Sequence, residues 1–160
     1  MRRKRPTSNT EHRKSKKSVD LRRYDFTDFR ATRVEERIYD LEDRLLDYSA
    51  GIIRLVEKLP TTRAGNHVAG QLLRSGTSPL PNHGEAESAE SPADFIHKLK
   101  ICLKELRETK RWLRLIEKVP LQSSSFIADV FQETDELIRI FVASIRTAEK
   151  RVAEKGVLRS

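Results

Sequence analysis

Residues 71–112 read QLLRSGTSPLPNHGEAESAESPADFIHKLKICLKELRETKRW. The first half of this stretch carries hydroxyl, amide and carboxylate residues where a simple amphipathic helix would carry apolar ones. Pro79 and Pro81 interrupt it, and because proline has no amide hydrogen, a helix must kink or break there. From Pro92 onward, apolar residues recur every three or four positions without a break. The stretch therefore predicts a kinked helix followed by a long, regular one.

The same apolar period continues on both sides of this stretch. It predicts a helix over residues 34–58 and another from the turn 122–125 to about residue 155, with Gly156 as its stop. The expected core positions are Ile38, Leu41, Leu45, Tyr48, Ile52, Leu55 and Leu59 in the first helix and Ile127, Val130, Thr134, Leu137, Phe141, Ile145, Ala148 and Val152 in the last.

Capping residues mark the ends of the two central helices. Thr61 or Thr62 can cap the kinked helix, whose second piece is expected over residues 82–89. Ser91 can cap the long helix with Pro92 at its first position, and that helix is expected to end near residue 118. The inward positions are Val68, Leu72 and Leu73 in the kinked helix and Phe95, Leu99, Cys102, Leu106, Leu113 and Ile116 in the long one.

Four amphipathic helices with short connections predict an all-α fold, an antiparallel up-down-up-down four-helix bundle with a kinked second helix. The bundle domain is expected over residues 34–158. Residues 1–23 have almost no apolar content, which predicts a disordered basic tail. A connector over residues 24–33 holds three aromatic residues that could fix the tail to the domain.

The charge of the chain is concentrated in this tail. The net charge is +8, and residues 1–23 contain ten Lys or Arg against two acidic residues, so the remainder is balanced. A basic tail usually means an anionic partner, with a solubilising arm as the alternative. The basic residues assigned to nucleic acid are Arg2, Arg3, Lys4, Arg5, Lys14, Lys16 and Lys17.

A second basic feature lies on the long helix. Its side chains, called the basic stripe below, are Lys100, Lys104, Arg107, Arg111, Arg114 and Lys118. Their spacing alternates between four and three, which places them within an arc of about 80° over roughly 27 Å. Such a stripe can follow phosphates, which predicts contacts with the backbone or shape of a nucleic acid and no reading of bases. The alternative is an ordinary solvated face.

The kinked segment supplies a third set of polar residues: Gln71, Arg74, Ser75, Ser78, Asn82 and Glu85. A helix broken by prolines exposes backbone polar groups, and these side chains could satisfy them as a structural network. A binding site is the alternative. The segment has neither a Ser–His–acid order nor a glycine-rich phosphate loop, which argues against catalysis.

Two smaller features are candidate sites. His83, Glu85 and His97 match no metal motif, so no metal or other cofactor is expected. Trp112 lies between the basic stripe and the core line of its helix, where a large aromatic residue is typical of an oligomer interface. Packing in the core and contact with a ligand are the alternatives for it.

Composition limits the remaining possibilities. With Cys102 as its single cysteine, the chain cannot form an intrachain disulfide, which fits a reducing compartment. No apolar run approaches membrane-spanning length, and the basic N-terminus is not followed by the apolar stretch of a secretory signal. A cytoplasmic protein without a membrane partner is therefore expected.

Residues 38–117 resemble a bacterial family of four-helix-bundle proteins whose founding members are encoded in 23S rRNA intervening sequences. The resemblance rests on IYDLEDR, EKLP, QLLRSGTS, PNHGEA and DFIHKLKICLKELRETKRWLRLI. The family's motif residues fall on Gln71, Arg74, Ser78, Asn82, Glu85, Asp94, Phe95, Lys98, Lys100, Glu105, Trp112 and Leu113. Pro79 and the basic tail depart from the family pattern.

This resemblance implies a left-handed bundle that assembles as a ring-shaped homopentamer and has no known enzyme activity. It also implies kinship with the accessory protein of diversity-generating retroelements, a basic bundle that binds RNA and a reverse transcriptase. We therefore expect a non-enzymatic protein that binds structured RNA, with DNA as an alternative, through the basic stripe and the tail. The second hypothesis is a protein-interaction scaffold or accessory subunit of a polymerase or reverse transcriptase.

Overall fold

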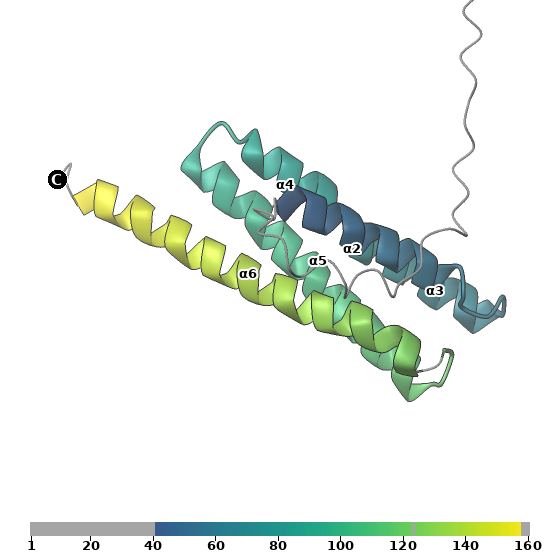
Figure 1. Ribbon diagram of the computed structural model, residues 1–160. Coiled ribbons are helices and arrows are strands. Elements are labelled where there is room, and N and C mark those ends of the chain that lie inside the picture. The colour runs from purple at the N-terminus through teal and green to yellow at the C-terminus, as the bar shows by residue number, and fades with distance from the viewer. Residues whose placement is uncertain (1–40, 123, 158–160) are drawn as a thin grey trace, which may run out of the picture. The chain divides into compact units, whose positions relative to one another are not determined.

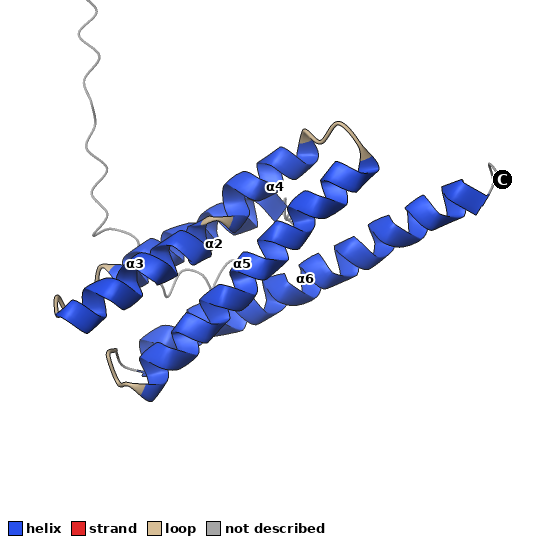
Figure 2. Cartoon of the chain, turned by 180° about the vertical axis from the view of Figure 1, so that it is seen from behind, coloured by secondary structure: helices blue, strands red, loops and turns tan. Residues whose placement is uncertain are grey.

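The computed structural model describes residues 41–122 and 124–157 (Figure 1). They form five helices: α2 (Leu41–Val56), α3 (Arg63–Thr77), α4 (Pro79–Glu87), α5 (Pro92–Lys118) and α6 (Ser124–Val157). No strand occurs in these two ranges (Figure 2). Because α3 and α4 together make the kinked second helix, the predicted all-α four-helix bundle is confirmed. Residues 34–40 of the predicted first helix, the tail and the connector lie outside the described residues.

Two of the predicted caps are present. The Thr62 hydroxyl accepts a hydrogen bond from the Gly65 amide at 3.0 Å, and the Ser91 hydroxyl accepts one from the Asp94 amide at 3.1 Å. Each bond satisfies an amide that has no partner inside its helix. The last helix continues through Gly156 to Val157, one residue beyond the expected stop.

The kink differs in detail from the prediction. The expected start of the second helical piece at Asn82 was wrong, because α4 begins at Pro79. Prolines are tolerated in the first turn of a helix, where the missing amide hydrogens have no intrahelical acceptor. Ser78 keeps right-handed helical angles between α3 and α4, so only this residue separates the two helices.

The helices pack as a bundle in which α5 contacts α3, α4 and α6, while α2 contacts α3, α4 and α6. No Cα atom of α2 lies within 8 Å of one in α5, so these two helices lie on a diagonal of the bundle. The Arg44 guanidinium of α2 binds Glu133 and Glu136 of α6, with 2.6 Å to each carboxylate. The hydrogen bond to Glu133 raises the pKa of Arg44, and the one from Arg44 lowers the pKa of Glu136.

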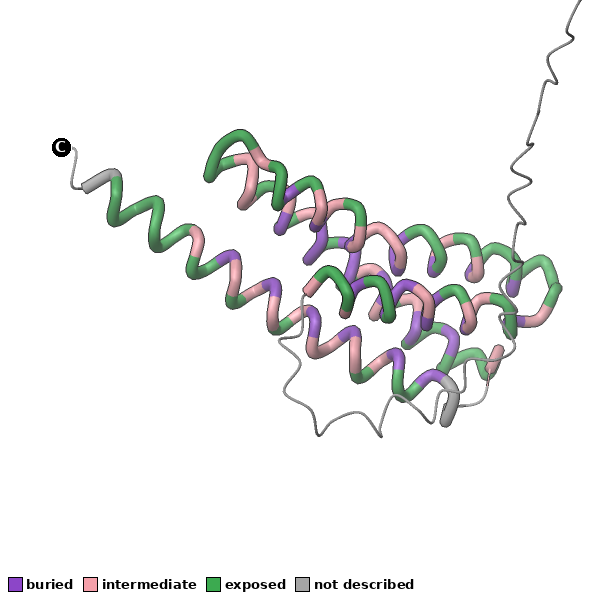
Figure 3. Tube along the Cα trace, turned by 45° about the horizontal axis from the view of Figure 1, so that its top comes forward, coloured by how far each residue is buried: buried purple, intermediate pink, exposed green. Residues whose placement is uncertain are grey.

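The core lies on the inner faces of the helices (Figure 3). Its fully buried members include Leu45, Ile52, Leu55, Leu72, Leu106, Leu113, Ile116, Leu137 and Phe141. The predictions that Leu73 and Val152 face inward were wrong, since these side chains are 38% and 43% exposed. Leu73 follows the buried Leu72 by one residue, which turns it about 100° away from the core line.

A layer of hydroxyl groups crosses the core, with one residue from each of four helices. Its members are Tyr48 of α2, Ser75 of α3, Thr109 of α5 and Thr134 of α6, all buried. Tyr48 and Thr134 lie 2.9 Å apart, and Thr134 lies 2.7 Å from the Val130 carbonyl. Because a hydroxyl has one hydrogen, Thr134 donates to that carbonyl while it accepts from Tyr48. Burial raises the pKa of Tyr48, so its phenol remains a donor.

Replacing Thr134 with valine should lower the free energy of unfolding by about 1–2 kcal/mol, because the buried Tyr48 hydroxyl loses its acceptor. The double variant Y48F/T134V removes both partners. Its loss in the free energy of unfolding should be smaller than the sum of the losses in the two single variants. Urea unfolding followed by circular dichroism measures both. Additive losses would show that the two hydroxyls do not interact.

Cys102 is buried on α5, and its Sγ lies 3.5 Å from the Pro79 carbonyl oxygen. Burial raises the pKa of this thiol to about 12. Since the thiolate is the reactive form, the folded protein should react with a thiol reagent at pH 8 at least about 100-fold more slowly than the unfolded chain. Absorbance after addition of a disulfide reagent, with and without urea, measures this ratio. Equal rates in the two states would contradict the buried position.

Candidate nucleic-acid interface

The six side chains of the predicted basic stripe are all exposed on α5. The core residue Thr109 lies about 180° from Lys100 around the helix, so the stripe occupies the outward face. Lys100 pairs with Glu149 of α6 at 2.7 Å. The other five form no ion pair with a carboxylate of the described residues, and Arg111 donates a longer bond of 3.4 Å to the Arg107 carbonyl. The stripe thus presents, between residues 104 and 118, five exposed cations without an ion-pair partner among the described residues.

Cations next to the stripe behave differently. Lys110, on the α6 side, pairs with Asp135 at 2.6 Å and lies over the Phe131 ring. Lys98 pairs with Glu85 at 2.5 Å, and this hydrogen bond raises the pKa of Lys98. The flanking charges therefore join helices together, as Lys100 does, whereas the other five stripe cations form no ion pair with a carboxylate of the described residues.

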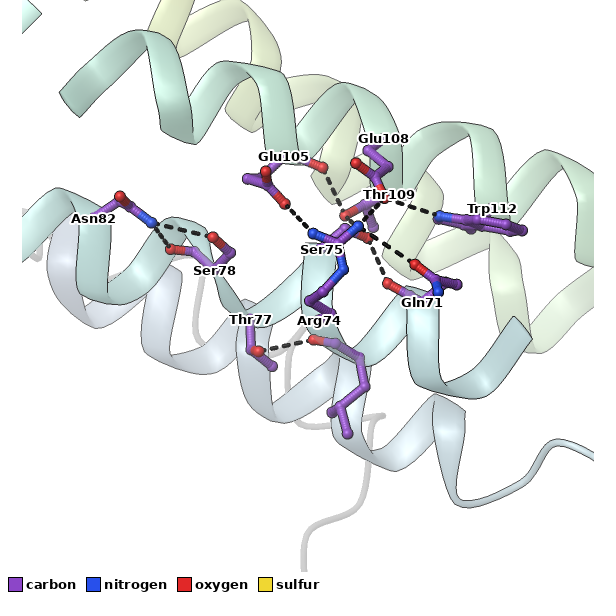
Figure 4. A network of polar contacts seen from close by, with 11 residues as sticks. Gln71, Arg74, Ser75, Thr77, Ser78, Asn82, Glu105, Glu108, Thr109 and Trp112 are labelled. Atoms are coloured by element: carbon purple, nitrogen blue, oxygen red, sulfur yellow. Dashed lines mark hydrogen bonds and ion pairs between the residues drawn. The ribbon is translucent and has the colours of Figure 1, made fainter. Parts of the chain in front are cut away.

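On the opposite flank, Arg74 of α3 reaches across to α5 (Figure 4). Its guanidinium binds Glu108 directly and lies 3.5 Å from Glu105, whose side chain is 9% exposed. It also donates to Gln71 at 3.4 Å. This arginine is shared between two carboxylates of α5, so Glu108 is engaged by α3 and does not neutralise the stripe.

The remaining residues of the predicted polar network form separate contacts. Ser75 donates to the Gln71 carbonyl at 3.0 Å and lies 3.0 Å from the Thr109 hydroxyl. Asn82 donates to the Ser78 carbonyl at 2.8 Å and to the Ser78 hydroxyl at 3.1 Å. Glu85 reaches α5 through its pair with Lys98.

Trp112 is half-buried on the α3 side of α5. Its ring meets His67 edge to face, with 6.0 Å between the ring centroids, and its indole nitrogen donates to Glu108 at 3.4 Å. Part of the ring therefore packs within the chain. Its predicted role at an oligomer interface stays a prediction.

Residues 39–143 match the family described as the 23S rRNA-intervening sequence protein. The chain belongs to this family. It is also similar to a crystal structure from Bacteroides thetaiotaomicron VPI-5482, described as a protein of unknown function from the S23 ribosomal protein family. The two chains share 33% identity with a TM-score of 0.63, over 66% of this chain and 98% of the other. No curated protein matches this chain.

The family match covers α2 to α5 and much of α6, so the basic stripe lies inside the region shared with the 23S rRNA-intervening sequence protein family. The basic tail precedes the matched region, and its seven assigned residues lie outside the described part of the chain. Stripe and tail are therefore separate elements of the sequence, one inside the matched region and one before it.

The candidate metal ligands His83, His97 and Glu85 have different surroundings. His83 is buried and meets Phe141 edge to face, His97 is exposed, and Glu85 is paired with Lys98. Among the described residues, no group of three His, Cys, Asp or Glu is placed to hold a metal ion. The helices that the structure describes include none long and apolar enough to cross a membrane.

Sequence reasoning did not identify Glu105, Glu108 and Thr109 as partners of the kinked helix. Two of them carried a signal: Glu105 falls on a family motif position, and Glu108 is an acidic residue at the edge of the basic stripe. To identify their partners, one must know the register between α3 and α5. The periodicity of a single helix gives no information on that register.

Proposed function

We propose that this protein binds nucleic acid, with structured RNA as the first partner to test, and acts by binding without catalysis. The observation that carries the proposal is the row of five exposed cations from Lys104 to Lys118, none paired with a carboxylate of the described residues. Uncompensated cations on a straight helix can each neutralise a phosphate and release a counterion. The family name refers to a 23S rRNA intervening sequence, which supports RNA as the first choice.

The expected contact is with the phosphate backbone. The stripe consists of lysine and arginine without an exposed aromatic ring, and Trp112 is packed against His67. Single-strand binding typically relies on aromatic side chains that stack on bases. A helical RNA stem, whose phosphates lie on a regular surface, therefore suits the stripe better than an unpaired strand.

The basic tail would add affinity without adding specificity. A homopentamer, as the family resemblance implies, would present five stripes and five tails on one particle. Several weak contacts on one particle raise the apparent affinity strongly when the partner can reach more than one of them.

The test is the affinity of the full-length chain for a labelled RNA hairpin, measured by fluorescence anisotropy over a series of salt concentrations. A second chain carries glutamine at the seven assigned tail positions. If five stripe contacts form, this tail variant should keep a slope of log affinity against log salt of about −4.5. Binding that disappears in the tail variant would move the site to the tail. Absence of binding in both chains would favour the scaffold hypothesis.

A further inference from the structure

Glu108 is an acidic residue that borders the basic stripe on α5. It lies four positions after Lys104 and three positions before Arg111. Side chains at these spacings are neighbours on the surface of a helix, and opposite charges there commonly form ion pairs. Although the structure describes all three residues, Glu108 pairs with neither cation and binds across to α3 instead.

Two side chains donate hydrogen bonds to the Oε1 atom of Glu108. One bond comes from the guanidinium of Arg74, and the other comes from the indole nitrogen of Trp112 at 3.4 Å (Figure 4). Arg74 also donates to Gln71 at 3.4 Å and lies 3.5 Å from Glu105. These contacts hold the guanidinium, and with it the Glu108 carboxylate, on the flank of α5 that faces α3.

We propose that Arg74 is a positioning residue of the basic stripe, because its ion pair with Glu108 keeps this carboxylate from pairing with Lys104 or Arg111. Once Arg74 is removed, these two are the cations that neighbour Glu108 along α5. A pair with either of them would neutralise part of the surface that five cations now present. The consequence for RNA affinity rests on the proposed function, whereas the movement of Glu108 does not.

Glu105 provides an internal comparison. It lies one turn before Glu108 on α5 and also contacts Arg74, but its side chain is only 9% exposed. None of the residues three or four positions away from it is a cation, so it has no partner in the stripe along the helix. Of the two carboxylates that share Arg74, only Glu108 can therefore neutralise the stripe.

The test compares full-length variants in their affinity for a labelled RNA hairpin, measured by fluorescence anisotropy near physiological salt. R74Q should bind about 5-fold more weakly than the parent protein, because the freed carboxylate removes the equivalent of one phosphate contact. R74Q/E108Q should bind within about 2-fold of the parent, because the carboxylate is gone as well. R74Q/E105Q has the same net charge as R74Q/E108Q but keeps Glu108, so it should remain about 5-fold weaker than the parent. R74K keeps a cation opposite Glu108 and should bind like the parent.

A second measurement needs no nucleic acid. Proton–nitrogen spectra of the side chains report whether the Nε–H group of Arg111 or the ammonium group of Lys104 gains a carboxylate partner. We expect at least one of these signals to shift in R74Q and in R74Q/E105Q, and to return to its parent position in R74Q/E108Q. Circular dichroism verifies that each variant is folded.

Several outcomes would overturn the proposal. Equal affinities of R74Q/E108Q and R74Q/E105Q would mean that net charge alone sets the affinity, and weak binding by R74Q/E108Q would mean that Arg74 itself touches the RNA. Signals of Lys104 and Arg111 that are the same in R74Q and in the parent would show that Glu108 does not move onto the stripe. If no chain binds the hairpin, the proposed function is wrong, and the spectra alone decide whether Arg74 positions Glu108.

Discussion

Reversing three charges of the basic stripe, in the variant K104E/R107E/R111E, should weaken binding to an RNA hairpin by at least about 100-fold near physiological salt. The three residues are exposed and form no ion pair with the described carboxylates, so the parent protein loses no internal contact of that kind. The loss should be smaller at high salt, because fewer counterions are released when fewer phosphates are bound. The slope against log salt should become less steep by about 3.

The matched control changes the same number of charges on another helix. Arg146, Arg151 and Lys155 are exposed on α6, so R146E/R151E/K155E has the same net charge as the stripe variant. We expect this control to lose far less affinity. Anisotropy titrations of both variants, with circular dichroism to verify folding, make the comparison. Equal losses would mean that net charge drives binding and that α5 has no special role.

Replacing Gly76 with alanine should lower the free energy of unfolding by about 2–3 kcal/mol, at the upper end of what overpacking of a core usually costs. A Cβ atom at this position would lie 2.7–2.8 Å from three side-chain carbons of Ile52. Ile52 is fully buried and cannot move into solvent. Either the isoleucine adopts a strained rotamer or α2 and α3 separate, and both disturb the centre of the core.

Gly70 is the matched control on the same helix. A Cβ atom there would have no neighbour within 4 Å, so Gly70→Ala should stabilise the protein by about 0.5–1 kcal/mol through helix propensity. The double variant G76A/I52V tests the cause, because removing a methyl group from Ile52 should recover part of the loss. Urea unfolding of the four chains provides the values. A stability of Gly76→Ala equal to that of the parent would contradict the close packing.

The fold was predictable because its signals are local. Helical periodicity, Ser91 with Pro92, and Thr62 each act within a few residues, and all three features are present in the structure. The start of α4 was missed because a proline pair can equally end one helix or begin the next. The exposure of Leu73 was missed because periodicity could not decide how wide the buried face of α3 is.

The candidate site was predictable to the extent that it lies on one helix. The spacing of the stripe defines its face, so the exposure of Lys104 and Arg107 follows from α5 alone. Which cations are compensated depends on neighbouring helices. The α5–α6 register sets the pairs of Lys100 with Glu149 and of Lys110 with Asp135. Only the packed helices therefore show which cations of α5 are paired with a carboxylate and which are not.

The contact of Arg44 with Glu133 also has a consequence for the order of folding. These residues are 89 positions apart, whereas the helices joined by short turns meet through much shorter loops. Closing a long loop costs more chain entropy than closing a short one, so the pairs formed by neighbouring helices should assemble first. Docking of α2 against α6 is then the last step of folding, and the contact between the hydroxyls of Tyr48 and Thr134 forms in that step.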